Sequence, residues 1–558
     1  MKFKAMLGGF AALSLSVAAL AQHAAPAASG AGDFSADAFR AHVTFLADDL
    51  LEGRDTGSRG HEIAARYVAT QFEALGLRPG NGDSWFQRVG FMRATAAPGA
   101  TLTVARRTFV QGQDMALRTG ADDAATIEAP LVFAGYGLDM PAHGFDDYRG
   151  IDARGKIVVV LSGTPAGIPT DVAAHMNGDK RRMAAARGAV GLITIRTRAD
   201  SAAMPWARMA RFSGRPFVTT SEPDGTPFAD APGLRFSALV DDSAANALFQ
   251  GAQRSLEAVL DEAARPDARP AGFALHESAQ LTRPAAAVTR FTSPNVVAIL
   301  PGSDPALAGE YVLLMAHLDH IGIRDPRPGD PPNVDRINNG AMDNATGIAT
   351  LIEVAREMSR PGNRPRRSIL FAAVTGEEKG DLGSRYLAHH PVLGNGRVVG
   401  VVNLDMPVLT YDFRDVIAFG AEHSTEGAAV ARAAAQMGVA LSPDPLPQEG
   451  LFTRSDHYAF VLEGIPSVFL MTGFANGGRE HFTDFLAHHY HSPSDDLSQP
   501  IDWNAGARFA RLNYLIAREI ADAPQAPLWY RGSFFGDAFG GNQPRAPHPA
   551  AMAAGAQH

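Results

Sequence analysis

Four short apolar runs in the second half of the chain constrain its fold more than any other feature. Helical stretches separate most of them: Ile348, Leu351, Ile352 and Ala355, for example, follow the spacing of an amphipathic helix. Runs of this length and composition are typical of buried strands in a sheet that helices cover on both faces. We therefore predict an α/β fold with a mixed, largely parallel sheet flanked by helices. The four runs are EYVLLMAH, RRSILFAAV, VVGVVNLD and IPSVFLMTG, which begin at residues 310, 366, 398 and 465.

The composition changes along the chain and divides it into segments. Residues 34–118 show two helical patterns around a Gly-rich loop, whereas residues 120–285 show short β-rich runs separated by Gly, Pro and Asp. Residues 291–525 contain the four apolar runs. We expect 34–118 and 291–525 to form one domain, into which a β-rich domain at 120–285 is inserted. A Gly-, Pro- and Ala-rich tail follows at 530–558.

The N-terminus has the pattern of a secretory signal peptide over residues 1–21. Lys2 and Lys4 precede an apolar stretch that ends in small residues, with Ala19 and Ala21 in an A-x-A arrangement. The stretch is shorter than the roughly 20 residues that span a bilayer, and no later segment is long and apolar enough to do so. We expect a soluble protein that is exported, to the periplasm or the medium, after cleavage near Ala21. Its formal charge of −9 argues against nucleic acid as a partner.

Acidic residues and histidines cluster where the predicted strands end. The carboxyl ends of strands border the ligand crevice of an open α/β sheet, so these side chains are expected to converge. Cysteine is absent from the chain, which leaves His, Asp and Glu as the only strong metal ligands. The candidates are His317 and Asp319 after the first run, Glu377 and Glu378 after the second, Asp405 at the end of the third, Asp343 at the start of a helix, and His491.

Two histidines and three carboxylates suit a pair of zinc ions, with one carboxylate bridging the two. Such a pair activates a water molecule and polarises the carbonyl that the water attacks. The adjacent glutamates in TGEEKG then have separate tasks: one binds metal, and its neighbour takes the proton of the water.

Six motifs in the same order resemble a known family. They are MAHLDHIG, NNGAMDNATG, TGEEKGDLGS, NLDM, RSDHYAF and YHSPSDD, and LADDLLEGRDTGSRG near the N-terminus resembles the opening of the same family. The chain is similar over about 34–118 and 291–520 to the exported co-catalytic di-zinc aminopeptidases, whose clan also holds glutamate carboxypeptidase and the transferrin receptor. The middle segment resembles a protease-associated domain, chiefly through GYG, FDDYRGIDARGKIVVVLSGTP and AAARGAVGLITI.

This resemblance implies the zinc exopeptidase fold and a division of the ligands between two Zn²⁺ ions per chain. His317 and Asp405 would bind one ion, Glu378 and His491 would bind the other, and Asp343 would bridge both. Members of the family often have a cis peptide bond after the bridging aspartate, which here is the bond from Asp343 to Asn344.

The resemblance also assigns roles beside the metals. Glu377 would be the general base, Asp319 would hydrogen-bond His317 and fix its tautomer, and Tyr490 would donate a hydrogen bond to the oxyanion. The SDH motif, which consists of Ser455, Asp456 and His457, would shape the substrate side. Four histidines match no motif position, and we expect them at the surface or behind the ligands: His320, His481, His488 and His489.

Taken together, these implications predict an exported zinc exopeptidase. Its expected activity is that of an aminopeptidase, which hydrolyses the N-terminal peptide bond of peptides through a hydroxide bound by two zinc ions, with Glu377 as base. A carboxypeptidase or a glutaminyl cyclase of the same clan is the alternative, as is a binding protein that has lost the chemistry. The complete ligand set argues against the last two. A second co-catalytic zinc family has similar H-x-D and E-E motifs, but its extra domain usually follows the E-E, whereas here the insertion precedes His317.

Overall fold

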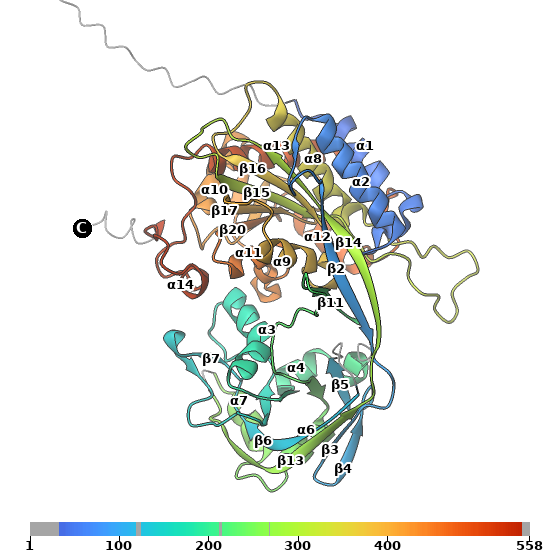
Figure 1. Cartoon of the computed structure of the whole chain (residues 1–558), viewed down its shortest axis with the longest axis vertical. Coiled ribbons are helices and arrows are strands. Elements are labelled where there is room, and N and C mark those ends of the chain that lie inside the picture. Colours follow the sequence, from blue (N-terminus) through green and yellow to red (C-terminus); the bar gives the residue numbers. More distant parts are fainter. Residues whose placement is uncertain (1–32, 119–123, 211–214, 267, 550–558) are drawn as a thin grey trace, which may run out of the picture.

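The protein forms two β-sheets with their covering helices, joined by a pair of long strands (Figure 1). The computed structural model describes residues 33–118, 124–210, 215–266 and 268–549. The predicted signal peptide and the last nine residues of the tail lie outside these ranges. Among the described helices, none has both the length and the apolar character needed to cross a bilayer.

The larger sheet contains, within the described residues, ten strands. Its four central strands are parallel, and antiparallel strands flank them on both sides. The predicted α/β class is confirmed, and parallel pairing is found in the centre of the sheet and again between the last two strands at one edge. In spatial order the strands are β11 (Phe217–Ser221), β2 (Phe86–Thr95), β14 (Ala287–Leu300), β16 (Ser368–Val374), β15 (Glu310–His317), β17 (Arg397–Leu404), β20 (Ser467–Thr472), β18 (Asp415–Phe419) and β19 (Ala440–Ser442), and β1 (Arg78–Pro79) pairs with β14.

Helices cover both faces of this sheet, which explains why its central strands are apolar throughout. Along β15, Val312, Leu314 and Ala316 pack into the core on one face, and Leu313 and Met315 pack into the core on the other. The first face is covered by α1 (Ala36–Leu46), α2 (Arg59–Ala74), α8 (Thr346–Ser359), α10 (Glu426–Gln436) and α13 (Trp503–Ala521), and the second by α9 (Leu382–His389) and α11 (His457–Leu462).

The second sheet comprises eight strands of the described chain and lies in the lower half of Figure 1. Its strands are β4 (Arg107–Val110), β3 (Thr101–Val104), β13 (Phe273–Arg283), β6 (Ala125–Phe133), β9 (Ile157–Leu161), β10 (Gly191–Ile195), β12 (Ser237–Val240) and β5 (Met115–Arg118). A two-stranded ribbon lies beside it, formed by β7 (Asp139–Met140) and β8 (Phe145–Asp146). The accompanying helices are α3 (Thr170–Ala186), α4 (Arg198–Ala203), α5 (Trp206–Met209), α6 (Asp242–Leu248) and α7 (Leu256–Ala263).

The chain enters and leaves the second sheet through β2 and β14, which pair antiparallel from Phe86 with Val296 to Thr95 with Ala287. Strands β3, β4 and β5 belong to the second sheet although they precede residue 120. Strand β11 lies within the expected insertion, but it pairs with β2 of the larger sheet. The second sheet is thus built from residues 101–283, and the inserted region also contributes an edge strand to the larger sheet. Its resemblance to a protease-associated domain stays a prediction.

Candidate metal centre and active site

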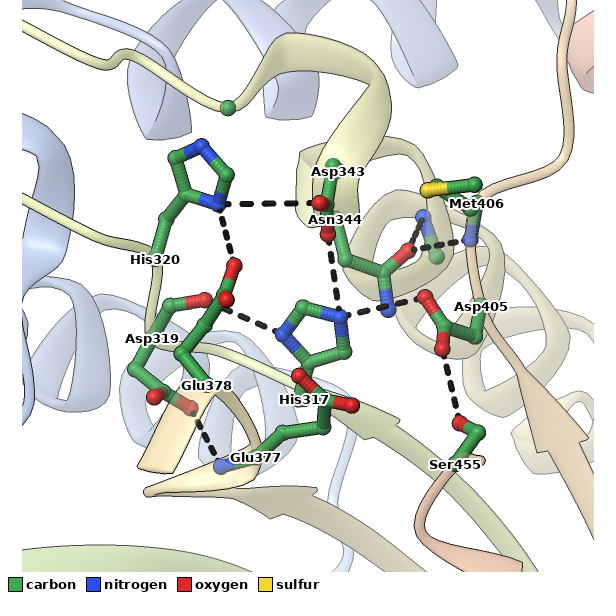
Figure 2. A network of polar contacts seen from close by, with 12 residues as sticks. His317, Asp319, His320, Asp343, Asn344, Glu377, Glu378, Asp405, Met406 and Ser455 are labelled. Carbon is green, nitrogen blue, oxygen red and sulfur yellow. Dashed lines mark hydrogen bonds and ion pairs between the residues drawn. The ribbon is translucent and has the colours of Figure 1, made fainter. Parts of the chain in front are cut away.

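His317 ends β15 and lies between two carboxylates (Figure 2). Its Nδ1 is 3.0 Å from the backbone oxygen of Asp319. Because a carbonyl oxygen only accepts, Nδ1 carries the hydrogen and Nε2 presents its lone pair. Nε2 lies 3.1 Å from Oδ1 of Asp405 and 3.2 Å from Oδ1 of Asp343. Two ligands of one tetrahedral zinc ion, each bound at about 2.0 Å, are separated by about 3.3 Å, so these three atoms have the spacing of a metal site.

A second group of side chains surrounds the other oxygen of Asp343. His491 Nε2 lies 3.1 Å from Glu378 Oε2 and 3.5 Å from Asp343 Oδ2, which are again separations typical of ligands to one metal ion. Asp343 therefore directs one carboxylate oxygen to each group, as a bridging ligand would. The five side chains predicted as ligands converge at one edge of the sheet.

His320 is also part of this centre and lies behind a predicted ligand, which is the second of its two expected places. It is fully buried, and its Nδ1 lies 2.7 Å from Glu378 Oε1. That distance is a hydrogen bond and is shorter than the separation of two ligands on one zinc ion. We therefore read His320 as orienting Glu378. His488 is exposed, and His481 and His489 are partly buried and bond Thr410 and Ser494 respectively.

The charges in this centre favour a bound cation. The side chains of Asp343, Glu378 and Asp405 are almost completely buried beside one another. Burial alone would lower the pKa of His317, but Asp405 and the other carboxylates raise it well above its usual value. The buried carboxylate oxygens repel one another unless a positive charge lies among them, which either a proton on Nε2 of His317 or a bound metal ion supplies. The donor atoms are nitrogen and oxygen, and this set suits zinc.

The two adjacent glutamates point to different sides of the turn that follows β16 (Figure 2). Glu378 faces His320 and His491, whereas Glu377 lines a pocket together with His317 and Asp405. Burial and the neighbouring carboxylates raise the pKa of Glu377 well above its usual value. A carboxylate with a raised pKa at the mouth of a metal centre suits a general base.

Asp319 holds the centre together through both its backbone and its side chain. Its carbonyl takes the Nδ1 hydrogen of His317, so the expected contact is made by the backbone, and the carboxylate is free for other partners. Oδ2 accepts a hydrogen bond of 2.8 Å from the hydroxyl of Thr56, and Oδ1 lies 3.3 Å from the backbone nitrogen of Glu377. Asp319 thereby connects the first ligand, the candidate base and the N-terminal part of the chain.

Arg54 holds the backbone of the loops around the same centre, although the sequence analysis assigned it no role. Its buried guanidinium donates to the carbonyl of Leu318 at 3.0 Å, and to those of Asn339 and Gly340 at 2.5 and 3.1 Å. Burial lowers its pKa to about 10, so the group keeps its charge at neutral pH. Arg54 thus fixes the loop after His317 and the loop that leads to Asp343. The sequence signal that could have identified Arg54 is the motif LEGRDTGSRG. Its likeness to the opening of the family did not indicate which of its residues supports the centre.

The loop before α8 is held from two further sides. Asp495, in the motif YHSPSDD, accepts hydrogen bonds from the backbone nitrogens of Met342 and Asp343 at 2.9 and 3.0 Å. A side chain at Gly340 would place its Cβ 2.2 Å from the carbonyl oxygen of Asp343, and φ there is +62°, so only glycine fits. The expected cis peptide bond between Asp343 and Asn344 is confirmed.

The SDH motif lies behind the centre and not in the pocket. Ser455, Asp456 and His457 are buried, and none of them lines the pocket. The Ser455 hydroxyl donates to Oδ2 of Asp405 at 2.7 Å and so orients that side chain. Because these side chains are buried outside the pocket, the motif is not placed to contact substrate directly.

A pocket of about 270 Å³ opens beside the metal centre. Its charged lining consists of Asp343, Glu377, Asp405 and Glu449 against Arg454 and the imidazole of His317, so acidic groups predominate. Tyr490 also lines it and stacks on the His491 ring at 3.8 Å. Burial and nearby carboxylates raise the pKa of Tyr490, which keeps its hydroxyl a hydrogen-bond donor. The apolar lining is Met406, Leu451, Phe469, Met471, Phe482 and Leu486.

Comparisons with known proteins agree with this centre. A probable zinc metalloprotease of Leptosphaeria maculans is 26% identical over 263 residues, which cover 42% of this chain and 58% of the relative. Leucine aminopeptidase 1 of Trichophyton rubrum is 26% identical over 239 residues, which cover 41% of this chain and 59% of the relative. The chain thus spans less than two thirds of the length of these curated relatives.

Among solved structures, an aminopeptidase from Aneurinibacillus sp. strain AM-1 is 20% identical with a TM-score of 0.48, and 88% of this chain and 95% of that chain are covered. The family model described as peptidase family M28 matches residues 295–517. This range contains every side chain predicted to bind metal. The resemblance is thereby confirmed for this part of the chain: residues 295–517 match peptidase family M28.

Proposed function

We propose that the protein is an exported zinc-dependent aminopeptidase. The observation that carries the proposal is the position of Asp343, which directs one oxygen to a His317–Asp405 group and the other to a Glu378–His491 group beside a pocket. Each group has donors and separations that suit one zinc ion. Two zinc ions, when bound, supply the Lewis acidity that activates a water molecule and polarises the scissile carbonyl.

The chain itself supplies proton transfer and orientation. Glu377 accepts the proton of the attacking water and passes it to the leaving amine, for which its raised pKa and its place on the pocket lining suit it. The backbone of Asp319 holds His317 in the tautomer with Nε2 free. Tyr490 donates its hydroxyl hydrogen toward the oxygen that becomes negative in the transition state.

The charge of the pocket favours a free amino terminus over a free carboxylate. Arg454 is the one arginine on the pocket lining, and its Nη1 lies 3.6 Å from the carboxylate of Glu449. A carboxypeptidase needs an available cation to bind the substrate carboxylate, whereas an α-ammonium group is attracted by the acidic lining. The apolar remainder of the pocket suits a large apolar N-terminal side chain, in line with the name of the leucine aminopeptidase relative.

The test is mass spectrometry of one peptide incubated with the zinc-loaded protein in three forms: free, N-acetylated and C-amidated. We expect N-terminal residues to be lost from the free and amidated forms, while the acetylated form stays intact. Loss from the C-terminus would transfer the protein to the carboxypeptidases. An unchanged set of peptides would contradict the proposal and favour a cyclase or a binding protein, which a peptide with N-terminal glutamine would then distinguish.

A further inference from the structure

One wall of the substrate pocket is covered from outside by the inserted domain. This pocket wall segment, residues 447–454, consists of two single-turn helices joined at Gly450, and it contributes Glu449, Leu451 and Arg454 to the pocket lining. Single turns of 3-10 helix have few hydrogen bonds and depend on packing for a fixed position. The packing comes from α3, which contacts both turns.

The contact at the centre of the segment is close. Gly450 has φ +59°, and a Cβ added to it would lie 2.9 Å from the Cβ of Ala174 in α3. The helix therefore rests directly on the backbone of the pocket wall segment. Leu451, on the pocket side, and Val172 and Met176, on α3, belong to or pack against one continuous core.

Two hydrogen bonds fix α3 at this place. Asp171 Oδ2 and His423 Nε2 are 2.6 Å apart, and both side chains are less than one fifth exposed. One turn further along α3, His175 Nδ1 and Tyr458 Oη are 2.7 Å apart. Phe452 of the pocket wall segment packs its ring 5.1 Å from that of His423. Helix α3 is thus bonded to His423 and Tyr458 beside the segment, and the segment packs against His423 through Phe452.

The contact between Asp171 and His423 is a hydrogen bond and not a metal site, although Glu422 lies near enough to complete a three-ligand group. Ligands of one zinc ion are separated by about 3.3 Å, which is longer than the 2.6 Å observed here. The His423 bond holds the pKa of Asp171 below its usual value even though burial alone would raise it. The pair therefore links the domains without an added ion.

We infer that the inserted domain sets the specificity of the pocket: through Asp171, Ala174 and His175, α3 positions the pocket wall segment against the N-terminal side chain of the substrate. The inference rests on the proposed peptidase function. None of the three residues lines the pocket, so they are positioning residues that act through Leu451 and its neighbours. A shift of the wall changes the fit of large side chains and leaves the metal centre in place.

The kinetic test compares Ala174→Leu with Ala186→Leu, the same change at an exposed position of the same helix. Substrates with N-terminal alanine and N-terminal leucine are used for each protein. In Ala174→Leu we expect the ratio of KM for leucine to KM for alanine to change at least fivefold, with kcat for alanine within twofold of the wild type. Ala186→Leu should match the wild type. An unchanged ratio in Ala174→Leu, or an equal fall in kcat for both substrates, would overturn the inference.

A second readout does not depend on turnover. Asp171→Asn removes the charge of the link with little change in shape, and we expect hydrogen–deuterium exchange of residues 447–454 to rise at least threefold while exchange in β15 stays constant. Exchange unchanged in this variant would refute the positioning role even if the wild type were inactive. Conversely, if the wild type were inactive but exchange still rose in Asp171→Asn, only the proposed function would be refuted.

Discussion

Thr56→Val tests whether the N-terminal segment serves the metal centre. Thr56 and Asp319 are buried, and the Thr56 hydroxyl donates to Asp319 Oδ2 at 2.8 Å. Valine has nearly the same shape, so the substitution removes one hydrogen bond and creates no cavity. A hydrogen bond to a charged group contributes about 1.5 to 3 kcal/mol, and the remaining bond on this carboxylate, from the Glu377 nitrogen, is long at 3.3 Å. We expect a loss of about 2 kcal/mol.

Most of this loss should appear in catalysis, because Asp319 orients both His317 and the backbone of Glu377. At about 1.4 kcal/mol per tenfold, 2 kcal/mol corresponds to a kcat lower by about 30-fold. The assay is kcat on an N-terminal leucine peptide, with zinc content and thermal unfolding measured in parallel. Thr56→Ser keeps the hydroxyl and should retain most of the activity. Wild-type kcat in Thr56→Val would refute the reasoning, and a loss in Thr56→Ser as large as that in Thr56→Val would show that the methyl group matters as much as the bond.

Four further predictions concern the centre and the inserted domain. Glu377→Gln should abolish turnover with metal content still near two ions per chain, and residual wild-type activity would remove Glu377 as the base. Glu378→Ala should lose one of the two ions, as measured by elemental analysis; full occupancy would show that the roles of the two glutamates are exchanged. His491→Ala should lose the same ion, whereas His320→Ala should keep it with weaker affinity, and the reverse result would make His320 the ligand. Lys180 is buried, which lowers its pKa to about 7 from 10.5 in the unfolded chain. Between pH 7 and 10 the unfolded chain therefore binds a proton that the folded protein has lost, so the free energy of unfolding should rise with pH over this range. In urea unfolding, Lys180→Met should show a flatter rise.

Sequence predicted well that the side chains at the carboxyl ends of the central strands converge. His317 ends an apolar run and Glu378 and Asp405 follow two others within four residues, and the rule that parallel strands bring their carboxyl ends to one edge is enough to bring them together. The same reasoning identified the central strands and α8, because burial on both faces leaves an apolar sequence. It did not show that antiparallel strands flank the centre, since an apolar run has no direction.

What sequence did not show depends on pairs far apart in the chain. Arg54 bonds carbonyls of Leu318 and Gly340, which follow it by more than 260 residues. Those acceptors are backbone oxygens, and they have no sequence signature. For His320 the sequence left two places open, at the surface or behind the ligands, and only its 2.7 Å contact with Glu378 shows that the second is right.

These long-range contacts imply that the functional unit is larger than the segment that defines the family. Residues 295–517 supply the predicted ligands and base, but the buried guanidinium of Arg54, whose pKa their carboxylates raise, lies outside this range. The field of that guanidinium acts on Asp343, Asp319 and Glu378 together, since all three raise its pKa in return. On another side, α3 contacts residues 447–454, which form one wall of the pocket. Arg54 in the N-terminal segment thus contacts the loops of the candidate metal centre, and α3 of the inserted domain contacts one wall of its pocket, so both parts of the chain touch the site without supplying a predicted ligand.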